Sequence, residues 1–431
     1  MTGPGVLGFV VDFLSVPALL VSIIVFIGYL AIKGKTFSDA LAGGLKAAIG
    51  FFILTAGAAT LTGSLDVLGP MITEAFNVQG VVPNNEAITA IAVSVAAVGR
   101  AAAIIMVLGF VFNILFARFT PLKYIWLTGH HSLYMATLLA VTLDVIGLKG
   151  VVLWLVGGVV LGFLQVLMPK WTQHLATKVA GSDDWTIGHF SSLSYVVAGF
   201  AAKILGGKPQ ETSMEDMKFP RGLGFLRESL VSTGIIMLII YLVPAFFLPA
   251  ASRSALGGDT NWFIFLLIQA LTFSAGVAVV IYGVRVILGE VVPAFAGIAE
   301  RIVPNAKPAL DIPVVFPFGA NSVIIGFLTS FVAGAIMMLL MRPIGLAAII
   351  PGLVPHFFVG GGAGVIGNAF GGRRGAVIGG FVNGIVISLG AALLLPALGM
   401  LGLENATYGD ADFQWVGILI SLIGRLFGVG G

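Results

Sequence analysis

Three polar motifs interrupt long apolar stretches of this sequence, and each brings a side chain that can bind or deprotonate a hydroxyl group. They are Thr128-Gly-His-His131, Gly188-His189, and Asp311 followed by Ile312-Pro313. An imidazole both donates and accepts hydrogen bonds, and a carboxylate accepts them or removes a proton. A small polar substrate with several hydroxyl groups needs both kinds of partner, so the motifs indicate a binding site for such a molecule.

Each motif also has a plainer interpretation. The histidine pair could lie at the level of the lipid headgroups, and Asp311 could form an ion pair with Lys307 or Arg301. A titratable side chain at membrane depth is costly unless it faces protein or a water-filled cavity. We therefore favour a functional role for His130, His189 and Asp311.

The elements that must position these residues are membrane helices. Of the 431 residues, 58% are hydrophobic and 10% are charged, and the mean hydropathy is +1.08. A soluble protein of this composition would lack a polar surface. We predict an all-α, polytopic integral membrane protein, a single membrane domain over residues 1–431 with about 10–11 transmembrane helices. The predicted spans are Val6–Ile32, Ala47–Thr62, Ala87–Phe116, Ile125–Ile146, Val151–Met168, Leu230–Ala250, Trp262–Val284, Ile312–Leu340, Leu346–Phe370, Ala376–Leu398 and Phe413–Phe427.

Some of these spans are predicted to be broken. Ile187–Ile204 is apolar but interrupted by polar residues, which is typical of a re-entrant segment. Pro308, Pro313 and Pro317 would interrupt any helix around Asp311 and free its backbone groups. Irregular backbone at membrane depth is tolerated where it lines a cavity, so these breaks also indicate a site.

The charges in the loops predict the orientation. Lys33 and Lys35 follow the first span, and segment 203–228 is rich in Lys and Arg, whereas segments 66–86 and 401–412 contain acidic residues and neither Lys nor Arg. Basic loops are retained in the cytoplasm. We predict that the N-terminus lies outside and the C-terminus inside, with loop 203–228 in the cytoplasm and segment 401–412 outside.

A weak internal repeat suggests two halves. The halves cover about 6–202 and 262–427 and are joined through loop 203–228. In both copies an apolar span is predicted to lead through a glycine-containing turn into an amphipathic stretch, as in many transporters. The matched pairs are Gly28 with Gly283, Gly34 with Gly289, Ala42 with Gly297, and Lys46 with Arg301.

Several function classes find no support in the sequence. There is no cysteine, which excludes disulfides, thiolate metal sites and a phosphocysteine on this chain. There is no Walker-type glycine loop and no metal-ligand set, so we expect neither an ATPase nor a cofactor or metal. The net charge of +3 is spread over loops and indicates no nucleic-acid partner.

Taken together along nearly the whole chain, the motifs resemble the ascorbate-type membrane subunit, EIIC, of the bacterial phosphotransferase system. The motifs that carry the resemblance are Ala56-Gly57, Leu127-Thr-Gly-His130, Ile187-Gly-His189, Asp311 with Phe318-Gly-Ala-Asn321, Ile350-Pro-Gly-Leu-Val-Pro355 and Phe370-Gly-Gly372. The resemblance implies a homodimer in the bacterial cytoplasmic membrane, with a substrate-carrying core domain and a scaffold domain. It also implies an elevator-type movement of the core.

The resemblance also implies partners. The substrate would be phosphorylated at the inner side by a phosphocysteine on EIIB, which works together with EIIA. We predict that EIIB docks on the basic loop with Arg221 and Arg227. The remaining partners are the membrane lipid and the small sugar or sugar-acid substrate.

Site residues follow from the matching motifs. The resemblance implies backbone contacts to the substrate at Gly57 and Ala58, and it implies that His130, His189 and Asp311 hold its hydroxyl groups. One of His189 or Asp311 would take the proton of the attacking hydroxyl, and neither is preferred at this point.

Three further substrate-binding positions depart from the family. Tyr134 and Phe190 each stand where the ascorbate proteins have glutamine, and Glu86 stands near a family aromatic position. Two lost amides remove hydrogen-bonding groups and add apolar surface. The resemblance therefore implies a small sugar or sugar acid that is ascorbate-like, without fixing it as ascorbate.

Transport coupled to phosphorylation is the function that we predict. The alternative is a secondary transporter of a small polar solute, driven by H⁺, which would use the same histidines and aspartate as a proton relay.

Overall fold

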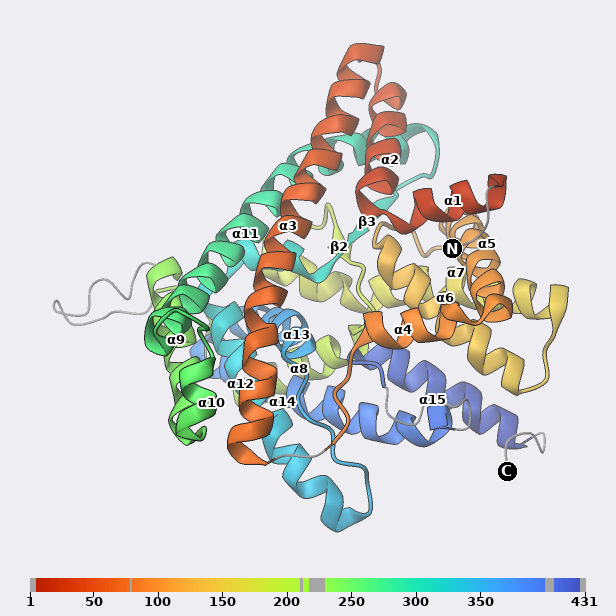
Figure 1. The fold of residues 1–431 in the computed structure, drawn as a ribbon. Coiled ribbons are helices and arrows are strands. Elements are labelled where there is room, and N and C mark those ends of the chain that lie inside the picture. Colours follow the sequence, from red (N-terminus) through yellow and green to blue (C-terminus); the bar gives the residue numbers. More distant parts are fainter. Residues whose placement is uncertain (1–4, 78–79, 210–211, 217–228, 400–406, 427–431) are drawn as a thin grey trace.

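The protein is almost entirely helical, with one small sheet near its centre (Figure 1). The computed structural model describes residues 5–77, 80–209, 212–216, 229–399 and 407–426. Within the described part, six helices are long and apolar enough to cross a membrane, and four shorter apolar helices accompany them. The all-α prediction is confirmed, and the chain is a multi-pass membrane protein. Arg221 and Arg227 lie outside the described residues.

The first predicted span is not one helix. Val6–Ile32 is divided into α1 (Val6–Ser15) and α2 (Pro17–Ala31), with Val16 between them in an extended conformation (φ −91°, ψ 101°). A proline has no amide hydrogen to donate and disfavours the helical conformation of the residue before it, so Pro17 begins a new helix instead of continuing the old one.

The third predicted span is also divided. Ala87–Phe116 falls on α4 (Asn85–Ser94) and α5 (Ala96–Phe119), and Val95 between them is extended (φ −76°, ψ 110°). The break allows α4 to pack on both α5 and α6 (Gly129–Val145). The start of α4 is thereby held close to the polar motifs.

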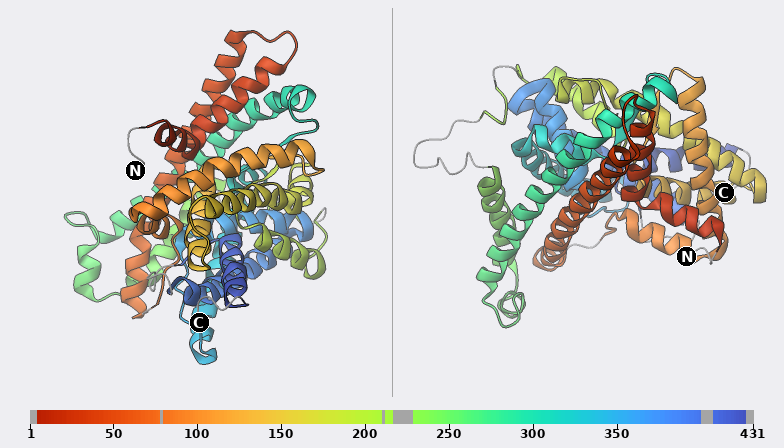
Figure 2. Two further views of the ribbon diagram at one scale, coloured as in Figure 1. Left: turned by 90° about the vertical axis from the view of Figure 1, so that its right-hand side faces the viewer. Right: turned by 90° about the horizontal axis from the view of Figure 1, so that it is seen from above.

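Four helices form one packed group that runs from the top to the lower left of Figure 1. They are α2, α3 (Phe37–Phe76), α9 (Ser229–Phe247) and α11 (Trp262–Arg301), with the short α10 (Ala250–Ala255) beside them. Helices α3 and α11 have 40 residues each and are about 60 Å long, twice the thickness of the hydrocarbon core. The α2–α3 end projects beyond the rest of the molecule (Figures 1 and 2).

Glycines bring α3 and α11 into backbone contact. A Cβ atom added at Gly57 would lie 2.7 Å from the Val280 nitrogen, and one at Gly283 would lie 2.5 Å from the Leu54 nitrogen. Only glycine permits such an approach, and the close contact increases the packing between helices in a membrane. Gly57 and Gly283 are therefore packing residues of this crossing.

The glycine-containing turn of the predicted repeat exists in one copy only. Gly34 lies in the turn between α2 and α3 with φ +87°, a conformation that favours glycine. Gly289, its predicted counterpart, lies inside the unbroken helix α11. The turn predicted for the second copy is therefore wrong, and the pairing of Gly28 with Gly283 reflects close helix packing at both sites.

The remaining helices surround the sheet and fill the right and lower parts of Figure 1. Helices α5, α6 and α7 pack together, and α8, α12 and α14 form a second cluster, with α15 between α14 and α6. The bounds are α7 Gly150–Ala180, α8 Ser192–Leu205, α12 Ala320–Met341, η3 Arg342–Ile344, α13 Leu353–Pro355, η4 His356–Gly360, α14 Gly361–Gly399 and α15 Ala411–Leu426. Helix α14 is kinked at Gly371 and Gly372, where the backbone leaves the helical conformation.

The sheet has three short parallel strands in the order β1 (Tyr124–Trp126), β3 (Lys307–Leu310) and β2 (Thr186–Ile187). After β3 the chain forms a 3₁₀ helix, η2 (Ile312–Phe318). The predicted break in the helix around Asp311 is thus confirmed, because the proline-rich stretch forms a strand and a 3₁₀ turn instead of an α-helix.

Candidate substrate-binding site

The three motif residues meet because each follows the carboxyl end of a strand. His130 lies just after β1, His189 after β2 and Asp311 after β3. The carboxyl ends of parallel strands lie at one edge of a sheet, which is a common place for ligands to bind. The side chains that the motifs predicted to converge do lie together, although strands this short have no periodicity to show it in the sequence.

Close backbone contact holds this edge together. The Gly188 nitrogen donates to the Leu310 carbonyl at 2.6 Å, and a Cβ atom at Gly188 would come within 2.6 Å of the Ala309 oxygen. The Thr128 hydroxyl donates to the Gly188 carbonyl. The turns that carry the two motif histidines are therefore tied to each other and to β3.

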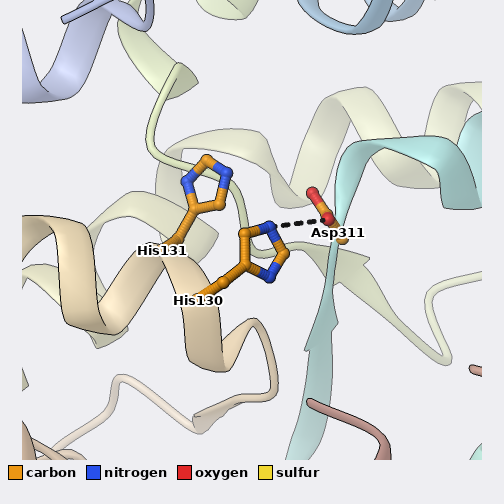
Figure 3. Close-up of side chains that lie close together, drawn as sticks. All are labelled: His130, His131 and Asp311. Atoms are coloured by element: carbon orange, nitrogen blue, oxygen red, sulfur yellow. Dashed lines mark ion pairs between the residues drawn. The ribbon is translucent and has the colours of Figure 1, made fainter. Parts of the chain in front are cut away.

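Asp311 is the centre of the site. Its Oδ1 lies 2.7 Å from Nδ1 of His189 and accepts the Ile312 backbone N–H at 2.7 Å. Its Oδ2 lies 3.5 Å from Nε2 of His130 (Figure 3). The His189 side chain is buried, whereas that of His130 is 33% exposed. Oδ2 of Asp311 and the His130 ring are thus among the polar groups that a ligand can reach.

Lys307, which the plainer interpretation offered as an ion-pair partner of Asp311, pairs with a different carboxylate. Lys307 pairs with Asp183, in the loop between α7 and β2. The hydrogen bond from the Lys307 ammonium lowers the pKa of Asp183 below its usual value, and the positive charge adds to the effect. Because Lys307 is engaged there, the interpretation of Asp311 as its structural partner is wrong.

A cavity of about 530 Å³ opens in front of Asp311, a size suited to a small-molecule ligand. One wall is a face of α3, which belongs to the packed group of α2, α3, α9 and α11 (the long-helix group). The other wall is the edge of the sheet with α13 and the segment before α4. Its polar lining residues are Thr55, Thr62, Asp66, Asn84, Asn85, His130, His131, His189, Asp311 and Asp410. The lining thus offers carboxylates, imidazoles and hydroxyls, which suit a polyhydroxylated ligand.

Of the other predicted site residues, some line the cavity and others pack away from it. Ala58 lines the cavity, whereas the Cα of Gly57 faces α11. Phe190 is fully buried, and its ring stacks on Trp126 with centroids 4.4 Å apart. Tyr134 contacts both histidines of the pair, with its ring centroid 5.7 Å from that of His130 and 5.8 Å from that of His131.

Gly57, Phe190 and Tyr134 are not among the cavity-lining residues of the described chain. The side chain of Glu86 lies outside the described part. The substrate-binding roles of these four residues stay predictions.

Sequence reasoning missed Asp410 and Asn85. Asp410 is 2% exposed, its Oδ2 accepts the Asn85 amide at 2.7 Å, and the same oxygen lies 3.8 Å from Nε2 of His189. The charge pattern had assigned Asp410 and Asp412 to a polar outer loop, but both are buried, so neither marks a side of the membrane. The available signal was their position directly before the apolar run of α15.

Asp412 ties the segment before α15 to the second motif. Its carboxylate accepts the backbone N–H groups of Ser192 at 2.7 Å and Leu193 at 3.0 Å, at the start of α8. Its own N–H donates to the Phe190 carbonyl at 2.9 Å. A carboxylate at a helix N-terminus satisfies free N–H groups and is favoured by the helix dipole. Asp410 is thereby held beside His189.

Two groups have spacing that would suit a metal ion. Ligand atoms of His131, His189 and Asp410 lie within 4.8 Å of one another, as do those of His130, His131 and Asp311. Several of these groups already have hydrogen-bond partners within the protein. Nδ1 of His131 accepts the Phe190 N–H at 3.4 Å, for example, and Asp410 accepts the Asn85 amide. We interpret both groups as hydrogen-bonding networks and assign no metal to them.

Comparison with known proteins identifies the family of this chain. The ascorbate-specific PTS system EIIC component of Mycoplasma pneumoniae is 26% identical over an alignment of 449 positions, and the alignment covers 88% of this chain and 65% of that protein. The chain thus spans slightly less than two thirds of that relative's length. The family model EIIC-GAT, described as the PTS system sugar-specific permease component, matches residues 12–412, a range that contains all the cavity-lining residues. This chain therefore belongs to the EIIC-GAT family of sugar-specific permease components of the phosphotransferase system (PTS).

Proposed function

We propose that this protein carries a small sugar or an ascorbate-like sugar acid across the bacterial cytoplasmic membrane and presents it for phosphorylation by a separate EIIB. The observation that carries the proposal is the group of His130, His189 and Asp311 at the edge of a cavity in a membrane protein of this family. Imidazole and carboxylate together can bind the donor and acceptor sides of neighbouring hydroxyl groups.

The chemical step needs a base but no cofactor on this chain. A substrate hydroxyl oxygen attacks the phosphorus of the EIIB phosphocysteine, so that an O–P bond forms while the P–S bond breaks and the cysteine leaves as a thiolate. The hydroxyl proton passes to a group of the site. Positioning and charge stabilisation dominate such transfers. The two candidates for that group are His189 and Asp311, whose Oδ1 is engaged by His189 and the Ile312 N–H.

An elevator-type movement fits the position of the cavity between two helix groups. The wall on α3 presents Thr55, Ala58, Ala59 and Thr62, which are short side chains on one face of a long helix. A face of short side chains would let the sheet and its helices slide past α3 while carrying the substrate. We further propose that two copies associate through the long-helix group, and that EIIB, working with EIIA, approaches from the cytoplasm.

Reconstituted vesicles test the proposal. Vesicles with the purified chain are given radiolabelled candidate sugars and ascorbate, with phosphorylated EIIB either inside or absent. We expect the substrate to accumulate as its phosphate ester only when EIIB is present. Accumulation of unmodified substrate driven by a pH gradient without EIIB would instead support the H⁺-coupled alternative.

A further inference from the structure

The imidazole of His189 lies between two carboxylates. Its Nδ1 is 2.7 Å from Oδ1 of Asp311, and its Nε2 is 3.8 Å from Oδ2 of Asp410. The three side chains come from different segments, and those of His189 and Asp410 are only 5% and 3% exposed. Two more titratable groups face the ring: His131 on α6, at 4.1 Å between centroids, and Tyr195 on α8, at 5.9 Å.

The position of Asp410 is built into the fold. Its Oδ2 accepts the Asn85 side-chain amide at 2.7 Å, and the Asn85 oxygen in turn accepts the Gly409 backbone N–H at 2.8 Å. Two residues further on, Asp412 binds the start of α8. A carboxylate held by this network keeps a fixed direction toward His189.

The two carboxylates determine which ring nitrogens carry protons. An ionised carboxylate can only accept hydrogen bonds, so Nδ1 must donate its proton to Asp311. Nε2 of His189 has no hydrogen-bond partner within the described residues, and the carboxylate of Asp410 is the negative charge nearest to it. A lone pair on Nε2 would face that charge inside a buried site, whereas a proton there would be attracted by it.

We propose that Asp410 is a positioning residue that keeps a proton on Nε2 of His189, so that Asp311 alone receives the substrate proton. The inference rests on the proposed function and decides between its two candidate bases. With both ring nitrogens protonated, His189 has no lone pair to accept a proton. When the hydroxyl oxygen bonds to phosphorus and the P–S bond breaks, the hydroxyl proton moves to Oδ2 of Asp311, and His189 remains unchanged.

The protonation of His189 can be observed directly. The chain contains 5 histidines, so ¹⁵N-histidine labelling gives a small set of ring signals, and His189→Gln identifies the pair that belongs to His189. In the native protein at pH 7 we expect both nitrogens of that ring to be protonated. An unprotonated nitrogen on His189 in the native protein would overturn the proposal, and this measurement needs no variant at position 410.

Asp410→Asn provides the functional test. The variant keeps the shape of the side chain but removes the charge, so one nitrogen of His189 should lose its proton. Asp311 then loses a cationic neighbour, and the acidic limb of the pH–rate profile for phosphorylation should move up by about one to three pH units. The substrate KM should change less than about threefold, because Asp410 acts through His189.

A double variant separates this role from direct substrate contact. In a His189→Gln background, Asp410→Asn should leave the pH–rate profile where His189→Gln alone puts it. A rise in KM that persists in that background, with no movement of the acidic limb in the single variant, would make Asp410 a substrate ligand and refute the proposal. Asp144→Asn is the matched control, because this aspartate is exposed and forms a surface ion pair with Lys149.

These experiments distinguish a failure of the role of Asp410 from a failure of the proposed function. If the native chain with EIIB forms no phosphate ester from any candidate substrate, the proposed function fails. If the native chain does form it, while Asp410→Asn retains the native pH–rate profile and the native His189 signals, only the role of Asp410 fails.

Discussion

Asp311→Asn should separate substrate binding from phosphorylation. Asparagine keeps the shape of the side chain and an acceptor oxygen for the Ile312 N–H, which lies 2.7 Å from Oδ1 in the native protein. It cannot take up a proton. The bond from His189 loses its charge-assisted character, and this should lower the free energy of unfolding by about 1 kcal/mol.

The magnitudes for substrate binding and phosphorylation differ widely. A substrate hydroxyl that binds Oδ2 would lose one charge-assisted hydrogen bond and keep a neutral contact, which weakens binding by about 1 kcal/mol, or roughly fivefold. A missing general base lowers the rate by about 10²–10⁴-fold. We therefore expect nearly normal substrate binding together with a loss of phosphoryl transfer of at least about a hundredfold.

Two measurements on the same preparation check this expectation. Equilibrium binding of labelled substrate to the purified chain gives the affinity, and single-turnover transfer from phosphorylated EIIB gives the rate. Asp144→Asn, with the same chemical change at a surface ion pair, should leave both near the native values. If Asp311→Asn slows phosphorylation no more than it weakens binding, Asp311 is only a ligand and the reasoning is refuted.

Other expectations concern binding, orientation, partners and specificity. His130→Ala should weaken substrate binding by about 1–3 kcal/mol in the same assay. The chain has no cysteine, so a single introduced cysteine reports its own position. In intact cells, Lys203→Cys at the predicted cytoplasmic loop should escape an impermeant thiol reagent, whereas Asp259→Cys, beyond the next predicted span, should react. The opposite pattern would reverse the topology. Membranes that contain only this chain should form no sugar phosphate until EIIB is added. Tyr134→Gln combined with Phe190→Gln should raise ascorbate affinity over the native chain, measured by direct binding, and weaker binding would contradict it.

That His130, His189 and Asp311 would lie together was predictable, because polar groups are rare at membrane depth. These three residues interrupt apolar sequence, and the prolines around Asp311 predict the break in the helix. The sheet that brings them together was not predictable. Its strands have two to four residues, too few for an alternating pattern, and they pair across segments that lie far apart in the chain.

The burial of Asp410 and Asp412, in contrast, could not be predicted from the sequence. Asp410 and Asp412 look like loop charges in the sequence, since acidic residues between apolar runs usually face water. Their burial depends on partners elsewhere, namely the amide of Asn85 and the start of α8. A carboxylate is stable in the interior only when such partners are present, and no local pattern reports them.

Tyr134 and Phe190 contact the histidines of the site and are not among the cavity-lining residues of the described chain. The Phe190 N–H donates to Nδ1 of His131, its ring stacks on Trp126, and the Tyr134 ring lies 5.8 Å from that of His131. His131 in turn contacts His189, with ring centroids 4.1 Å apart. The resemblance implies glutamine at both positions in the ascorbate proteins, and glutamine amides could hydrogen-bond to the neighbouring histidines or to the substrate. Replacing them by aromatic rings leaves the cavity-facing carboxylate of Asp311 in place, so a change of substrate would come through the tilt and hydrogen bonding of the histidines.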